Sequence, residues 1–153
     1  MGEPTYNNCG LQSRRLIRRV GRRGILSMPF PVSKAKFASL VEQALAELPE
    51  PFASALDEMS LEIRDWPTPQ QLKSVGLQED HLLLGLYRGV PRPERSVEQS
   101  GRLPDVIYIF QDDCQEVCES ENDLVREVRV TVLHELGHHF GLDEDDLDRL
   151  GYG

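Results

Sequence analysis

The chain has little that could cross-link it or anchor it in a membrane. Its 153 residues include only three cysteines, Cys9, Cys114 and Cys118, which cannot all pair with one another. A domain of this length can bury its own core without disulfides, so a reducing compartment fits best. No stretch is long and apolar enough for a membrane span, and the N-terminus lacks the apolar core of a secretory signal. We therefore expect a cytoplasmic protein with no membrane partner.

Basic residues are also scarce, with 17 Lys and Arg against 26 Asp and Glu and a formal net charge of −9. A surface of this sign repels nucleic acid, which we exclude as a partner of the main body. Residues 1–27 differ, because they contain paired arginines, a single acid and no sustained apolar period. We expect residues 1–27 to be a flexible basic N-terminal extension, serving either as a basic arm or as a dispensable addition, and residues 28–153 to form the domain.

The spacing of apolar residues predicts the main helices and strands of this domain. Phe37, Leu40 and Ala44 recur at helical spacing between a capping Ser33 and Pro49, which predicts a helix over residues 33–48. The same reasoning predicts a helical turn at 51–57, strands around Leu61 to Trp66, at Leu82 to Tyr87 and centrally at Val106 to Phe110, and a long helix from Glu121 to Phe140. We interpret the acidic run between Asp112 and Asp123 as a solvated loop.

One motif within the predicted long helix carries chemistry. Residues 134–138 read His-Glu-Leu-Gly-His, the HExxH pattern. Histidines four residues apart share a helix face, with β-carbons about 6 Å apart, so His134 and His138 can bind one Zn²⁺. Glu135 lies one step round the helix, where its carboxylate can take a proton from a metal-activated water. The pattern predicts zinc-dependent hydrolysis of an amide bond.

Two other interpretations of the histidines and cysteines carry less weight. His134 and His138 could simply lie on a solvent-exposed face of the helix. Their neighbours in the sequence are apolar, however, which indicates burial, and burying two histidines without a metal or another partner would cost free energy. Cys114, Cys118 and His139 could form a second metal site, yet a CxxxC pair without a matching pair is a weak signal. We expect unpaired thiols, and a packing or hydrogen-bonding role for His139.

The run VLHELGHHFGLDEDDLDRLGY, with the segments LLLGLYRGVPRPERS and LPDVIYIF, resembles the small bacterial zincin-like metallopeptidases. The resemblance implies a compact α/β (α+β) domain, in which a mixed β-sheet has helices packed on one side and a C-terminal HExxH helix. Larger zincins bind extended peptide along an edge strand. We therefore expect the strand at Leu82 to Tyr87 to lie at the sheet edge and to pair with a peptide or protein substrate.

The third zinc ligand is predicted from the turn after the helix. Gly141 can adopt the left-handed conformation that ends a helix and turns the chain back toward the metal. The HxxGxxH or HxxGxxD pattern of zincins of this shape then places the ligand at Glu144. Asp143 or Asp145 could replace it with a small shift of the turn, or the third donor could be water.

The function expected from these residues is that of a zinc-dependent peptidase with Glu135 as general base and acid. The alternative is a non-catalytic peptide-binding module with a structural zinc, which a closed four-ligand site would favour. The sequence leaves the oligomeric state open.

Overall fold

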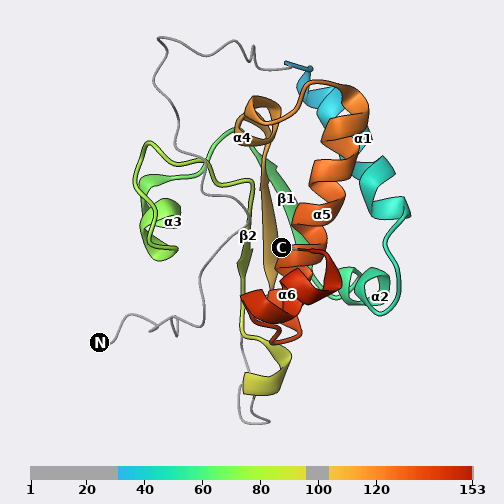
Figure 1. Cartoon of the computed structure of the whole chain (residues 1–153), viewed down its shortest axis with the longest axis vertical. Coiled ribbons are helices and arrows are strands. Elements are labelled where there is room, and N and C mark those ends of the chain that lie inside the picture. Colours follow the sequence, from blue (N-terminus) through green and yellow to red (C-terminus); the bar gives the residue numbers. More distant parts are fainter. Residues whose placement is uncertain (1–30, 96–103, 153) are drawn as a thin grey trace.

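The structure is a computed structural model that describes residues 31–95 and 104–152. Within these ranges it has an α+β fold with a small mixed sheet of three strands and six α-helices (Figure 1). The elements are α1 (Lys34–Ala46), α2 (Phe52–Leu56), β1 (Ser60–Arg64), α3 (Pro69–Ser74), β2 (Gly85–Arg88), the 3₁₀ turn η1 (Arg92–Glu94), β3 (Val106–Phe110), α4 (Gln111–Glu116), α5 (Glu121–His139) and α6 (Glu144–Leu150). The predicted fold class is confirmed. The proposed extension, residues 1–27, lies outside the described residues.

The sheet has the strand order β1-β3-β2, with β3 in the centre as predicted. Strand β1 pairs with β3 in parallel, with Ser60 opposite Val106, and β2 pairs with it antiparallel, with Gly85 opposite Ile109. Both edges of β3 are therefore hydrogen-bonded to neighbouring strands. In the sheet formed by the described residues, β2 is an edge strand, as expected.

The main core lies between the sheet and helices α1, α2 and α5, which share one side of the sheet (Figure 1). Ile107 and Ile109 of β3 point toward this side and are fully buried. Helix α1 begins as predicted, since the Ser33 side chain accepts a 3.1 Å hydrogen bond from the backbone N–H of Lys36. This core fixes α5, and with it the HExxH motif, against the sheet.

A smaller cluster covers part of the opposite face, where no helix was expected. Helix α3 starts with a capping box, in which Thr68 and Gln71 each bind the other's backbone N–H. Its residue Leu72 packs with Leu86 and Phe110 from the sheet. Thr68, followed by Pro69 and then Gln71, was a visible signal for this helix start.

Two of the predicted strands had the wrong bounds. Strand β1 ends at Arg64, so Trp66 follows the strand and its side chain is 62% exposed. Strand β2 begins only at Gly85, although Leu82 to Leu84 are buried. The backbone N–H of Leu83 donates to Asp113 Oδ2 at 2.8 Å. At this position a side-chain carboxylate accepts the backbone hydrogen bond that a strand carbonyl would otherwise accept.

The acidic run was also misinterpreted as a loop. The first part of this run forms helix α4. Within it, Asp113 is only 2% exposed, and its buried carboxylate accepts a hydrogen bond from the backbone N–H of Leu83. A carboxylate with a backbone donor can be buried at moderate cost, which the sequence pattern did not indicate.

Among the described residues, no helix combines the length and the apolar composition that crossing a membrane requires.

Candidate metal centre

Helix α5 carries the HExxH motif in its last turns, as predicted. It is capped by Ser120, whose hydroxyl accepts a 3.1 Å hydrogen bond from the backbone N–H of Asp123. His134 and His138 project from one face, with ring centroids 4.8 Å apart and planes inclined by 83°. The His134 side chain is buried and that of His138 is 19% exposed. One imidazole is therefore fixed by packing while the other borders solvent.

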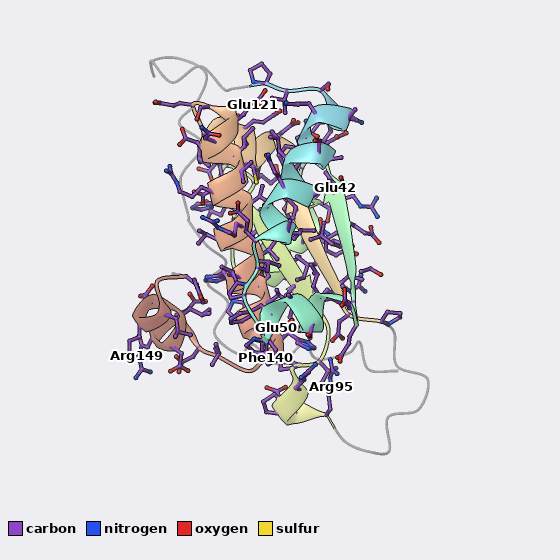
Figure 2. The ribbon with its side chains drawn as sticks, turned by 90° about the vertical axis from the view of Figure 1, so that its right-hand side faces the viewer. Glu42, Glu50, Arg95, Glu121, Phe140 and Arg149 are labelled. Carbon is purple, nitrogen blue, oxygen red and sulfur yellow. The ribbon has the colours of Figure 1, made fainter. Side chains whose placement is uncertain are left out.

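The helix ends where the sequence predicted a reversal of the chain. Gly141 has a φ of 79°, and the N–H groups of Gly141 and Leu142 donate 3.0 Å bonds to the carbonyls of His138 and Gly137. This pair of bonds is a Schellman motif, which needs a residue that tolerates positive φ. Figure 2 shows the chain turning away from the end of α5, labelled at Phe140, and forming α6, labelled at Arg149.

Helix α6 docks directly on the motif. A β-carbon added to Gly137 would lie 2.3 Å from Leu147 Cδ2, so the absence of a side chain in the motif lets α6 approach α5. The N-terminus of α6 is fixed by a capping box between Asp143 and Asp146, with bonds of 2.9 and 3.3 Å. Asp143, considered above as an alternative ligand, is engaged in this cap. Glu144, the first residue of α6, is directed toward the two histidines.

The structure brings His134, His138 and Glu144 together. Glu144 Oε1 lies 3.5 Å from His134 Nε2 and 3.4 Å from His138 Nε2, and the three candidate ligand atoms lie within 4.8 Å of one another. Asp143 and Asp145 do not belong to this group. Two imidazole nitrogens and one carboxylate oxygen are a donor set that suits zinc, and they leave a fourth position open. These residues therefore fit a metal ion.

A backbone carbonyl orients the buried histidine. His134 Nδ1 lies 3.0 Å from the carbonyl oxygen of Tyr152. A carbonyl can only accept a hydrogen bond, so Nδ1 carries the proton and the lone pair of a neutral ring is on Nε2. This is the nitrogen that faces Glu144.

Glu135 is almost completely buried, at 2% exposure, between the helix and the edge strand. Its Oε2 accepts a 2.8 Å hydrogen bond from the backbone N–H of Tyr87 in β2, and its buried Oε1 has no hydrogen-bond partner among the described residues. Buried carboxylate oxygens are normally hydrogen-bonded, and exceptions often mark functional groups. The arrangement suits a carboxylate that receives a proton.

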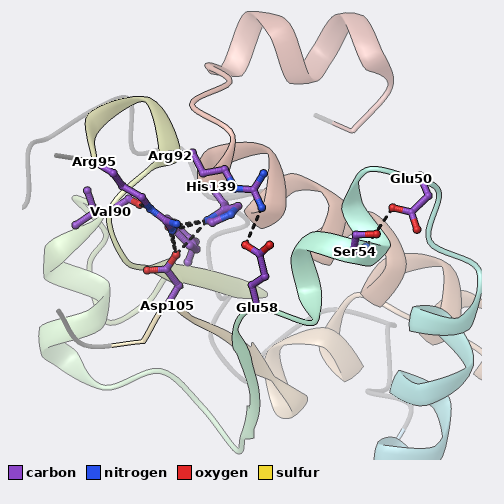
Figure 3. Close-up of polar contacts among 9 residues, drawn as sticks. Glu50, Ser54, Glu58, Val90, Arg92, Arg95, Asp105 and His139 are labelled. Carbon is purple, nitrogen blue, oxygen red and sulfur yellow. Dashed lines mark hydrogen bonds and ion pairs between the residues drawn. The ribbon is translucent and has the colours of Figure 1, made fainter. Parts of the chain in front are cut away.

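A second polar cluster is formed by His139, Asp105, Arg95 and Tyr87. Figure 3 shows His139, Asp105 and Arg95 of this cluster converging. His139 Nδ1 is 3.1 Å from both Asp105 Oδ2 and the Tyr87 hydroxyl and 3.3 Å from Arg95 Nη2, and Arg95 forms an ion pair with Asp105. Burial and then Arg95 lower the pKa of His139, although Asp105 acts in the opposite direction. Burial, followed by the Asp105 charge, raises the pKa of the Tyr87 hydroxyl. His139 thus has the predicted hydrogen-bonding role and is not part of the candidate metal-ligand group.

The two described cysteines take no part in the metal centre. Cys114 and Cys118 are buried in the main core, and no disulfide joins them. The Cys114 thiol contacts the Leu84 carbonyl at 3.7 Å, and neither sulfur belongs to the metal-ligand group found in residues 31–95 and 104–152. They remain thiols and not a disulfide, as predicted, and the structure adds that they lie in the core.

Tyr87 and Tyr152 contact the motif without having been predicted from the sequence. Both do so through main-chain atoms, the N–H of Tyr87 and the carbonyl of Tyr152. Every non-proline residue has these atoms, so no side-chain pattern could have identified the two positions.

Comparison with known proteins identifies the family of the chain. The family model for zincin-like metallopeptidases matches residues 56–153, which include all three strands, the motif and Glu144. Among solved structures, the chain is similar to a conserved hypothetical protein from Thermo thermophilus, with 28% sequence identity and a TM-score of 0.46. The similarity covers 78% of this chain and 97% of that one. A search of curated proteins found no match.

Proposed function

Because the chain belongs to the zincin-like metallopeptidase family, a family that implies a metal ion and typically zinc, we propose that it is a zinc-dependent peptidase. The observation that carries the proposal is the convergence of His134, His138 and Glu144, whose ligand atoms lie within 4.8 Å of one another. Glu135 lies next to this group on the same helix. Ligands and general base thus come from one short stretch of chain.

In this proposal, His134 and His138 would hold the zinc through Nε2 and Glu144 would hold it through a carboxylate oxygen. When bound, zinc supplies a Lewis acid that activates water at neutral pH and polarises the carbonyl of the scissile bond. The protein supplies three donors, which leaves room for water and substrate. The interactions of Glu144 with both histidines support its choice over Asp143 and Asp145.

Glu135 acts as the general base. It takes a proton from the attacking water and later delivers it to the amine that leaves. The hydrogen bond from the Tyr87 N–H holds Oε2, so Oε1 is the oxygen that exchanges the proton. A zinc ion with a purely structural role would not require a neighbouring buried carboxylate that can accept a proton.

The substrate is a peptide or protein in an extended conformation. Strand β2 lies at the edge of the described sheet and contacts the motif helix at Gly85 and Tyr87. A peptide that adds to this edge by main-chain hydrogen bonds would lie close to Glu135. Because the Tyr87 N–H already donates to Glu135, pairing there would use the Tyr87 carbonyl and the main chain of Gly85.

A peptide-library digestion tests the proposal. The zinc-loaded protein is expected to cut peptides at defined positions, detected by mass spectrometry. Removal of the metal with a chelator should abolish cleavage, and added zinc should restore it. If the zinc-loaded protein retains bound peptides but cuts none, the alternative applies, namely a peptide-binding module with a structural zinc.

A further inference from the structure

We propose that the segment Gly151–Tyr152 is a positioning element of the metal centre, which acts by fixing the tautomer and orientation of His134. The proposal rests on the proposed function to the extent that His134 is a zinc ligand. Its basis is the 3.0 Å contact between His134 Nδ1 and the Tyr152 carbonyl oxygen. The carbonyl has no proton to give, so the contact selects the ring with its proton on Nδ1.

The choice of tautomer decides which nitrogen can bind the metal. His134 Nε2 lies 3.5 Å from Glu144 Oε1, on the side where His138 also presents its Nε2. With the Nδ1 proton held by Tyr152, the Nε2 lone pair is available without further rearrangement. Outer partners of this kind typically contribute about 10- to 100-fold to metal affinity.

Several contacts of the segment Gly151–Tyr152 hold the Tyr152 carbonyl in position. The Tyr152 N–H donates to the Leu147 carbonyl at 2.9 Å, and the Gly151 N–H donates to the Asp148 carbonyl at 3.0 Å. Gly151 has a φ of 81°, which most residues with a side chain adopt only under strain. The Tyr152 ring packs edge-on against Phe52, with centroids 5.8 Å apart. The segment is therefore held by α6 on one side and by α2 on the other.

Helix α6 consequently contributes to the metal centre at both of its ends. Its first residue, Glu144, reaches the two histidines directly, while the turn after its last residue returns to His134 through Tyr152. Leu147 between them is fully buried against Gly137. A displacement of α6 would thus change the carboxylate ligand and the orientation of His134 together.

The test combines zinc affinity with the state of the His134 ring. Tyr152→Ala removes the ring that anchors the segment, and Gly151→Val disfavours its positive φ. Each should lower zinc affinity by roughly 10- to 100-fold in a chelator competition. Tyr152→Phe keeps the ring and the carbonyl and should match the unmodified protein. Unchanged affinity in both Tyr152→Ala and Gly151→Val would overturn the proposal.

A second measurement needs no variant and therefore does not depend on how the variants fold. In the zinc-loaded full chain, nitrogen-15 NMR of the imidazole rings should show a proton on His134 Nδ1 and the metal on Nε2. Zinc on His134 Nδ1 would overturn the proposal, while His134 would still be a zinc ligand of the proposed peptidase. If the unmodified chain holds no more zinc than His134→Ala, the proposed function and this positioning role both fail.

Discussion

The backbone N–H of Tyr87 donates a 2.8 Å hydrogen bond to Oε2 of Glu135, which joins the edge strand to the proposed general base. Two residues earlier, Gly85 makes this approach possible. A β-carbon there would lie 2.5 Å from Thr131 Cγ2 and 3.2 Å from the Tyr108 carbonyl oxygen. The missing side chain in β2 thus sets the distance between the strand and α5.

Gly85→Ala should therefore push α5 away from β2. We expect a loss of about 1–3 kcal/mol in the free energy of unfolding, as for other overpacked sites, and slower peptide hydrolysis because Glu135 shifts. Urea denaturation and hydrolysis assays measure both effects. The matched double variant Gly85→Ala/Thr131→Ser lacks the Cγ2 methyl group and should recover much of the loss. A fully stable Gly85→Ala protein would contradict this account of the contact.

The purified protein should contain about one zinc ion per chain. His134→Ala or His138→Ala should remove most of it, because two remaining donors make a weak site. Metal analysis by mass spectrometry gives the stoichiometry. His81→Ala is the control, since His81 binds the Gln78 N–H and is not part of the metal-ligand group. Full zinc content in both motif variants would exclude these residues as ligands.

Glu144→Ala should weaken zinc affinity much more than Asp145→Ala. Glu144 lies within 3.5 Å of both histidine nitrogens, whereas its neighbour Asp145 is exposed and outside the metal-ligand group. Both substitutions remove one acid from the first turn of α6, so their effects on the helix itself should be similar. A chelator competition that gave the reverse order would assign the third ligand to Asp145.

The core thiols should be unreactive in the folded protein. Burial raises the pKa of Cys114 well above its usual range, and Cys118 is 2% exposed. The thiolate is the reactive form, so a thiol reagent should label neither residue until the protein unfolds. A Cys9→Ser background restricts the measurement to these two positions. Rapid labelling of two thiols under native conditions would be inconsistent with the buried core described above.

The sequence predicted those parts of the fold that depend on side-chain periodicity. Helix α1 has regular apolar spacing, the central strand β3 is an uninterrupted β-branched and aromatic run, and both formed close to their predicted bounds. The histidine pair was predictable for the same reason, since a spacing of four residues places both on one helix face. The Gly141 turn was also predictable because it requires positive φ.

Contacts between distant segments were not predictable from such patterns. Asp113 is buried because it meets the Leu83 N–H, 30 residues away in the chain. Gly85 and Gly137 are needed for close approaches to Thr131 and Leu147, which only the folded chain brings together. The candidate ligands could therefore be predicted from local spacing in the sequence. The residues that surround them could not, because tertiary structure brings them together.

In the proposed zinc peptidase, Glu135 is the general base. The most direct measurement compares the rate of peptide hydrolysis by Glu135→Gln and by the unmodified protein, each with its zinc content verified. An amide cannot accept the proton, so the variant should keep its zinc and its fold but lose roughly 10²- to 10⁴-fold in turnover. Equal turnover in the two zinc-loaded proteins would contradict the account.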